Sequence, residues 1–232
     1  MPIVNDMPVS AAVEDYAKAI YALQTRQNDG AGGAVTTNAL ADRLDVTPAS
    51  ASAMVKRLDG LGLVRHTPYH GVELTDAGEK VALEVLRHHR LLETYLAESL
   101  GVPWDLVHAE AEVLEHVLSE ELEERIAAKL GDPVVDPHGD PIPTRDGRIV
   151  EAPSSALDSL PVGACGRFVR VSDADPAMLR YLDTHGIRPG DPFEVVDKQP
   201  FGGPVFARFN TGPDPHVLGG DLARAMRVEL DA

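Results

Sequence analysis

The stretch Val46-Thr-Pro-Ala-Ser-Ala-Ser-Ala-Met-Val-Lys-Arg-Leu58 decides the fold of the N-terminal part of the chain. Thr47 and Pro48 mark a tight break, and Pro48 suits the first turn of a helix over roughly 48–61. Small residues crowd the start of this helix, which would let it enter a DNA major groove. A shorter helix is expected over 37–44, capped by Thr36 or Thr37. Two short helices joined in this way predict a helix-turn-helix, with a plain helical bundle as the alternative.

The segments on either side support this prediction. Residues 9–27 have the apolar spacing of an amphipathic helix, and two short strands over 63–66 and 71–74 enclose a turn that would form a wing. Residues 36–74 contain four cations and four anions, so we expect modest DNA affinity that depends on dimerisation. The residues expected to contact DNA are Thr47, Pro48, Ser50, Ser52, Lys56, Arg57 and Tyr69.

Composition and charge exclude several classes of protein. The 232 residues carry a formal net charge of −16 and are 44% hydrophobic, which predicts two or three globular domains and argues against indiscriminate binding to nucleic acid or anionic lipid. No apolar run reaches the ~18 residues that a transmembrane helix needs. Cys165 is the single cysteine, so no internal disulfide can form. We expect a cytoplasmic protein with neither a membrane nor a small organic ligand as partner.

Long acidic helices are expected after the wing. Thr75 would cap a helix that runs to about Leu100, followed by helices over 105–118 and 119–130. Residues 75–130 contain thirteen acids and five bases, a net charge of −8, and acid crowded around histidines suggests a bound cation. If it is helical, the stretch His108-Ala-Glu-Ala-Glu-Val-Leu-Glu-His116 places its histidines and two of its glutamates on one face. A solvated acidic face is the alternative.

Three groups of residues resemble the diphtheria toxin repressor family. They are Glu14-Asp-Tyr16 with Ile20-Tyr21, Arg87-His-His-Arg-Leu-Leu-Glu93, and Gly101-Val-Pro-Trp104 with Val107-His-Ala-Glu110 and Glu115-His116. The likeness covers essentially the whole chain and includes Pro137-His-Gly-Asp-Pro-Ile-Pro143. It implies a metal-activated homodimeric repressor that binds an operator in double-stranded DNA and is not an enzyme.

The same resemblance implies a mainly α architecture with a small β domain. A winged helix-turn-helix would occupy residues 1–74, a helical metal-binding and dimerisation domain 75–145, a linker 146–158 and an SH3-like β-barrel 159–232. The composition of residues 131–157, rich in Pro, Gly and Asp, is typical of a tether. Beyond it, strands are expected over 166–172, 192–197 and 204–209, with a short helix over 177–184.

The resemblance also implies two metal sites. The regulatory site would use three carboxylates and an imidazole, from Asp15, Glu112, Glu115 and His116. The second would use His89, Glu93 and His108, with a carboxylate from the C-terminal domain supplied by Asp173 or Asp175. In related manganese sensors the histidine that matches His89 also joins the regulatory site. For Asp173 and Asp175 the alternative is that they only cap the short helix at Pro176.

Two residues favour Mn²⁺ over Fe²⁺. Iron sensors of the family have methionine at the position of Asp15 and cysteine at that of Glu112, and hard oxygen ligands suit Mn²⁺, which lies at the weak end of the divalent affinity order. Lys18 stands where some manganese sensors have another carboxylate, so a two-metal cluster would lose a ligand. We expect a Mn²⁺-activated repressor that limits metal uptake. An iron(II)-dependent repressor of the same family is the first alternative, and a helical di-metal carboxylate enzyme is the remote one.

The remaining acids and one histidine are expected at the surface. His88 is interpreted as a surface histidine, and the solvated acids would be Glu110, Glu120, Glu121, Glu123 and Glu124.

Overall fold

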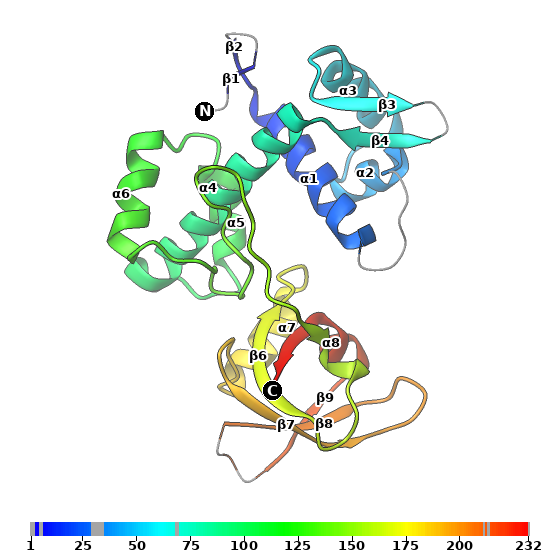
Figure 1. The fold of residues 1–232 in the computed structure, drawn as a ribbon, viewed down its shortest axis with the longest axis vertical. Helices are drawn as coiled ribbons and strands as arrows, with labels where there is room; N and C mark the ends of the chain where they lie inside the picture. The colour runs from blue at the N-terminus through cyan, green and yellow to red at the C-terminus, as the bar shows by residue number, and fades with distance from the viewer. Residues whose placement is uncertain are drawn as a thin grey trace. The chain divides into compact units, whose positions relative to one another are not determined.

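The computed structural model describes residues 3–4, 7–28, 35–67, 70–210, 212 and 214–231. The chain divides into two compact units, and the ribbon of each can be followed in Figure 1. The first unit comprises Met1–His89, Glu112–Ala128 and Pro143–Arg148, and the second comprises Arg90–Ala111, Lys129–Ile142 and Ile149–Ala232. Among the described helices, none combines the length and apolarity that crossing a membrane requires.

The N-terminal helices begin at residues that satisfy their first N–H groups. Two short paired strands, β1 (Ile3–Val4) and β2 (Met7–Pro8), precede α1 (Ala11–Asn28). Thr36 caps α2 (Thr37–Arg43) by accepting from the Ala39 amide at 3.1 Å. Thr47 caps α3 (Pro48–Gly60) by accepting from the Ser50 amide at 3.1 Å. The predicted starts of both helices are confirmed, and each helix ends one residue earlier than predicted.

A hairpin follows α3 and closes the first hydrophobic core. Strand β3 (Val64–Thr67) lies one residue later than predicted, and it pairs antiparallel with β4 (Gly71–Leu74), which has the predicted bounds. The core beneath them contains fully buried side chains from α1, α2, α3 and the hairpin, namely Ile20, Leu40, Val55, Leu58, Leu63 and Val72.

The helices after the hairpin include one whose bounds we predicted wrongly. Helix α4 (Asp76–Leu100) begins after Thr75 as predicted, but α5 (Val107–Leu114) is shorter at both ends than the predicted 105–118. The Val117 amide donates to the Leu114 carbonyl at 3.1 Å, so Glu115 and His116 lie in a tight turn between α5 and α6 (Glu120–Leu130). The predicted continuous helical face over 108–116 is therefore not formed.

Residues 131–142 are not the tether that their composition predicted. Asp136, His138 and Ile142 are buried, and Val135 forms a β-bridge with Pro141. Gly139 has a φ of 89°, and a Cβ there would lie 1.9 Å from the Val169 carbonyl oxygen. Glycine is required because this loop passes directly against the backbone of the C-terminal domain.

The second unit contains a six-stranded antiparallel sheet. Its strands are β5 (Ser155–Ala156), β6 (Cys165–Val171), β7 (Pro192–Lys198), β8 (Val205–Phe209), β9 (His216–Leu218) and β10 (Met226–Leu230), in the order β5-β10-β6-β7-β8-β9. A short 3₁₀ helix (Leu157–Ser159) and helices α7 (Pro176–Thr184) and α8 (Gly220–Ala225) complete it.

Three of these strands and α7 lie within one residue of their predicted bounds, whereas β5, β9, β10 and α8 were not predicted. Phe168, Leu179, Leu182 and Met226 are buried in the core of this unit, and Trp104 packs into the same core. Strands β5 and β9 stand at the two ends of the sheet order, so the described strands form an open sheet rather than the closed barrel we expected.

Candidate metal centres

The predicted regulatory residues of the first unit lie together between α1 and the turn after α5. Nε2 of His116 is 2.9 Å from Oδ1 of Asp15 and 3.5 Å from Oε1 of Glu115. One ligand atom from each of these three residues lies within 4.8 Å of the others. We call Asp15, Glu112, Glu115 and His116, with their neighbours Glu14, Lys18 and His89, the first cluster.

A buried glutamate orients the histidine of the first cluster. Nδ1 of His116 donates to Oε2 of Glu14 at 2.5 Å, and Glu14 is only 2% exposed. This bond leaves Nε2 as the ring nitrogen that faces Asp15 and Glu115. Metal-bound histidines are typically oriented by a carboxylate in this way. The prediction missed Glu14, although its place beside Asp15 on an otherwise apolar helix face could have indicated it.

Asp15 supplies an observation that fits a divalent cation. Its Oδ1 is buried and has no hydrogen-bond partner, because the nearby His116 nitrogen does not have the geometry of a hydrogen bond. Burial raises the pKa of Asp15, the charges of His116 and Lys18 oppose that rise, and those of Glu115 and Glu112 add to it. A cation would satisfy this oxygen and compensate the crowded carboxylates.

Lys18 is an internal cation of the first cluster. Its Nζ lies 2.6 Å from Oε1 of Glu112 and 2.6 Å from Oε1 of Glu115. Burial lowers the pKa of Lys18, but the charges of Glu115 and Glu112 outweigh this effect and raise it. His89 also reaches this cluster, because its Nδ1 donates to Oε2 of Glu115 at 2.5 Å. Both Glu115 oxygens are thus engaged.

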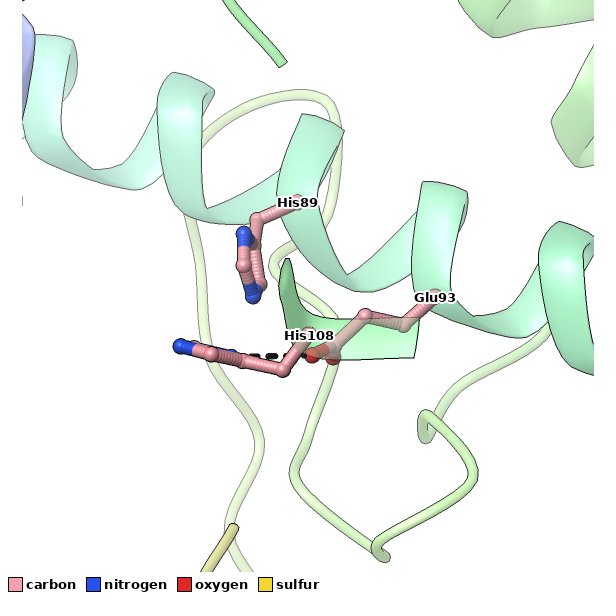
Figure 2. Close-up of side chains that lie close together, drawn as sticks. All are labelled: His89, Glu93 and His108. Carbon is pink, nitrogen blue, oxygen red and sulfur yellow. Dashed lines mark hydrogen bonds and ion pairs between the residues drawn. The ribbon is translucent and has the colours of Figure 1, made fainter. Parts of the chain in front are cut away.

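The second cluster gathers Glu93, His108 and Asp173 in the second unit. Nδ1 of His108 lies 3.2 Å from Oε1 of Glu93 and 3.0 Å from Oδ2 of Asp173. Hydrogen bonds to Asp173 and then to Glu93 raise the pKa of His108 to about 10, against the effect of burial. Figure 2 shows the pair of Glu93 and His108, with His89 one turn before Glu93 on α4.

Asp175 does not join the second cluster. Its Oδ1 accepts from the Ala177 amide at 2.9 Å, which makes it the N-cap of α7. The capping alternative therefore describes Asp175 correctly but not Asp173, whose carboxylate points to His108.

A histidine that we did not include among the ligands lies beside the second cluster. His138 is fully buried, and its Nε2 donates to the Trp104 carbonyl at 2.8 Å. Its Nδ1 has no hydrogen-bond partner and lies 3.8 Å from Oε2 of Glu93 and 3.9 Å from Oδ1 of Asp136. A buried ring nitrogen that has no hydrogen-bond partner and faces two carboxylates at this distance fits a ligand of a bound cation.

The loop that carries His138 is held onto α4 by an arginine. Nη1 of Arg90 donates to the Pro141 carbonyl at 2.5 Å, and the same side chain lies 3.8 Å from Asp136 and 3.6 Å from Asp140. Burial raises the pKa of Asp136, and the charges of Asp140 and Glu93 add to that rise. The family likeness of Pro137–Pro143 is the sequence signal that points to His138.

Two residues expected at the surface are buried. His88 is 2% exposed and Glu123 is 4% exposed, because Nε2 of His88 lies 3.2 Å from Oε2 of Glu123 and Nε of Arg87 donates to Oε1 of the same carboxylate at 2.5 Å. These contacts join α4 to α6, so the surface prediction for both residues is wrong. The other acids in that prediction are exposed as expected, namely Glu110, Glu120, Glu121 and Glu124.

The candidate DNA-contacting residues occupy the exposed side of α3. Thr47, Pro48, Ser50, Lys56 and Arg57 are exposed, whereas Ser52 is half-buried. The hydroxyls of Thr47 and Ser50 lie 2.8 Å apart, so part of their hydrogen-bonding capacity serves the helix cap. Tyr69 lies outside the described residues.

The chain matches three described domain families in sequence. Residues 9–72 match "Iron dependent repressor, N-terminal DNA binding domain", residues 75–144 match "Iron dependent repressor, metal binding and dimerisation domain", and residues 156–230 match the FeoA domain.

Curated relatives extend this match along the chain. The diphtheria toxin repressor of Corynebacterium glutamicum is 32% identical over 228 residues, which cover 93% of this chain and 95% of the relative. The iron-dependent repressor IdeR of Mycobacterium tuberculosis is 42% identical over 79 residues, and that match spans 34% of IdeR.

Solved structures of related proteins have the same fold. A manganese-dependent transcriptional repressor in complex with manganese is 40% identical, with a TM-score of 0.86 over 94% of this chain and 100% of that one. The manganese regulator SloR is 29% identical, with a TM-score of 0.74 over 94% of this chain and 98% of its own. The chain therefore belongs to the iron-dependent repressor family, that of the diphtheria toxin repressor, whose members are metal-dependent DNA-binding transcriptional repressors and not enzymes.

Proposed function

We propose that this protein is a Mn²⁺-activated, homodimeric repressor that controls metal-uptake genes. The observation that carries the proposal is the first cluster, in which carboxylates and an imidazole of α1 and of the turn after α5 lie together beside Lys18. The buried Oδ1 of Asp15, which has no hydrogen-bond partner, is the feature of this cluster that most needs a cation.

The residues of the first cluster can couple metal binding to DNA binding. Asp15 lies on α1, whose buried face shares one core with α2 and α3. Glu115 and His116 lie beyond α5, so any ligand held jointly by them and Asp15 fixes α1 relative to that turn. A divalent cation would supply the positive charge that holds these carboxylates together. Coupling of this kind typically amounts to ~1–3 kcal/mol.

The donor set favours Mn²⁺ over softer metals. Asp15, Glu112 and Glu115 offer only oxygen, and no sulfur atom lies among the described residues of the first cluster. Oxygen-rich sites discriminate against metals that prefer thiolate. The solved manganese-dependent repressor named above supports the same assignment. Lys18 occupies part of the space between Glu112 and Glu115, so we propose one ion in this cluster rather than two.

Exposed apolar residues of α5, of α6 and of the turn between them support a homodimer. Val113 and Val117 are each 72% exposed and Leu122 is 48% exposed in the first unit. Together with the match to a dimerisation domain, this surface supports self-association that would present two copies of α3 to two DNA half-sites. A repressor of this kind acts in the compartment that holds the DNA.

We assign the second cluster as a further metal site. His108, Glu93 and Asp173 would be its ligands, joined by His138 and Asp136 from the loop before the C-terminal domain. The proposed layout keeps a winged helix-turn-helix at 1–74, a metal-binding and dimerisation domain at 75–145, a linker at 146–158 and an SH3-like domain at 159–232.

A DNA-binding titration tests the proposal against its iron-dependent alternative. DNA is first selected from a random pool by the metal-loaded protein, and its affinity is then measured with Mn²⁺, with anaerobic Fe²⁺ and with chelator. We expect Mn²⁺ to activate at lower free concentration than Fe²⁺, and Asp15→Met with Glu112→Cys to shift activation toward Fe²⁺. Preferential activation of the unmodified protein by Fe²⁺, or equal affinity with chelator, contradicts the proposal.

A further inference from the structure

Trp104 is the only tryptophan of the chain, and it contacts both the second cluster and the C-terminal domain. Its side chain is buried in the core that the six-stranded sheet and α7 build. Its carbonyl accepts from Nε2 of His138 at 2.8 Å, and its ring stacks on that imidazole, with the ring centroids 5.8 Å and the planes 18° apart. Trp104 therefore holds His138 by its backbone and by its side chain, and both residues belong to the second unit.

These two contacts determine where the other nitrogen of His138 points. The hydrogen bond fixes the Nε2 edge of the imidazole, and the stacked indole fixes the plane of the ring. Together they direct Nδ1 to the side where Glu93 and Asp136 lie. Metal-bound histidines are commonly oriented by a partner on their second ring nitrogen, and loss of that partner weakens metal binding. The Trp104 carbonyl is such a partner for His138.

The indole is in turn held by an arginine of the C-terminal domain. Cζ of Arg188 lies 4.0 Å from the centroid of the Trp104 ring. The loop after α7 presents this arginine, because its amide donates to Oδ2 of Asp191 at 2.8 Å and its guanidinium donates to Asp183. A guanidinium over an aromatic face is attracted by the ring quadrupole, and tryptophan is the ring that attracts it best. Arg188 therefore fixes the indole against the C-terminal domain.

Packing alone does not explain why this residue is a tryptophan. Nε1 of Trp104 is buried and finds no hydrogen-bond partner within the described part of the chain. A buried donor without an acceptor is unfavourable, and a phenylalanine in the same core would not introduce one. What tryptophan adds is a larger and more electron-rich face, which can contact the guanidinium of Arg188 and the imidazole of His138 together.

We propose that Trp104 and Arg188 are positioning residues of the second metal site and act through His138. Neither would touch the ion, since Trp104 sets the orientation of the imidazole and Arg188 sets the position of the indole. The inference rests on the second cluster being a metal site, as proposed above. Its consequence is that the metal affinity of this cluster depends on a cation of the C-terminal domain that lies outside the ligand set.

Mn²⁺ titration of the full-length protein separates positioning from simple electrostatics. Arg188→Gln removes a positive charge, which by itself would raise the affinity for a cation. Loss of positioning acts in the opposite direction. We expect the Mn²⁺-binding step that His138→Phe weakens to become about 3- to 10-fold weaker in Arg188→Gln. The control Arg224→Gln removes an exposed arginine of α8 that pairs with Asp221, and it should not weaken this step.

A second variant and a second signal test the same chain of contacts. Trp104→Phe keeps the carbonyl that orients His138 but reduces the aromatic face, so the same step should weaken by at least about threefold. In proteins that retain Trp104, paramagnetic Mn²⁺ should quench its emission as this step fills. The quenching should move to higher Mn²⁺ concentration in Arg188→Gln and in His138→Phe. The Tm in chelator shows that each variant is folded.

The outcomes distinguish this inference from the proposed second metal site. If His138→Phe weakens a step but Arg188→Gln binds as tightly as Arg224→Gln, Arg188 acts only as a remote charge and the inference is overturned while the site stands. A step of wild-type affinity in Trp104→Phe overturns it equally. If His138→Phe leaves every step unchanged, the second site does not include His138, and the inference fails with it.

Discussion

Nζ of Lys18 on α1 lies 2.6 Å from Oε1 of Glu115 in the turn after α5. The ammonium is 15% exposed and the carboxylate is fully buried, so this ion pair is screened little by solvent. It joins the same two segments that the proposed metal ion would join. In the metal-free protein the Lys18 ammonium therefore already places a positive charge between α1 and this turn. A metal ion must compete with it for Glu115.

Replacing Lys18 should separate these two contributions. In Lys18→Gln the chelated protein loses the internal cation, and we expect its free energy of unfolding to fall by about 2 kcal/mol, less than the ~3–5 kcal/mol for a fully buried pair. The Mn²⁺ affinity should rise by at least about tenfold, because a unit charge about 4 Å away repels a cation by several kcal/mol at an effective dielectric constant of ~20. Urea unfolding and Mn²⁺ titration measure the two effects.

The control for this variant is Lys80→Gln, since Lys80 is an exposed lysine of α4. It should leave both quantities unchanged. An unaltered Mn²⁺ affinity in Lys18→Gln would show that the ammonium does not compete with metal.

His138→Phe tests whether the second cluster extends into the loop before the C-terminal domain. The ring of His138 stacks on Trp104 at 5.8 Å, so phenylalanine keeps the packing but removes both nitrogens. Stability without metal should change by less than about 2 kcal/mol, because the lost bond to Trp104 is offset by removal of the unpartnered Nδ1. Metal affinity of this cluster should fall about 10- to 100-fold.

Calorimetric titration with Mn²⁺ measures this loss, and the exposed His185 of the same unit provides the control His185→Gln. Retention of every metal-binding step in His138→Phe would exclude His138 as a ligand.

Lys56 and Arg57 should bind DNA phosphates without reading sequence. Each alanine variant is expected to weaken binding to all sequences alike and to reduce the slope of log affinity against log salt by about 1. Fluorescence anisotropy at several salt concentrations gives this slope. Arg125→Ala removes an exposed cation from α6 and should leave the slope unchanged. Equal slopes for Lys56→Ala and wild type would remove Lys56 from the DNA interface.

The stability of the metal-free protein should fall as pH rises above neutrality. Hydrogen bonds to Asp173 and Glu93 raise the pKa of His108 to about 10, against about 6.5 in the unfolded chain. The folded state thus holds this proton more tightly. The contribution of protonated His108 to the stability of the fold is complete below pH ~6.5 and is lost as pH rises through about 10.

Thermal unfolding in chelator across this range measures the effect, and His108→Gln should flatten the curve between pH ~6.5 and ~10. His185→Gln is again the control. A wild-type Tm that does not decline in this window would mean that His108 is not protonated in the folded protein.

The local elements were predictable because their signals are local. Thr47 followed by Pro48 marks the start of α3, and the alternation of apolar residues marks β6, β7 and β8. The end of α5 could not be predicted, because no glycine or proline follows Leu114 to stop the helix. Family likeness placed Asp15, Glu115 and His116 together, which periodicity alone could not do across about a hundred residues.

The residues that were missed depend on contacts distant in sequence. Glu14 is buried and contacts His116 of a distant segment, and His138 faces Glu93 and Asp136 only because the fold brings α4 and this loop together. His88 looks like a surface histidine until α6 brings Glu123 against it. Burial of a polar residue by a distant helix leaves no mark on its immediate sequence neighbours.

The central claim is that the first cluster couples metal binding to DNA binding, and a titration of Glu115→Gln tests it most directly. Affinity for selected DNA is measured with Mn²⁺ and with chelator in wild type, in Glu115→Gln and in the control Glu110→Gln, which changes an exposed glutamate of α5. We predict that Mn²⁺ raises wild-type and Glu110→Gln affinity about 5- to 150-fold, and that Glu115→Gln loses this gain. Full Mn²⁺-dependent gain in Glu115→Gln would contradict the account.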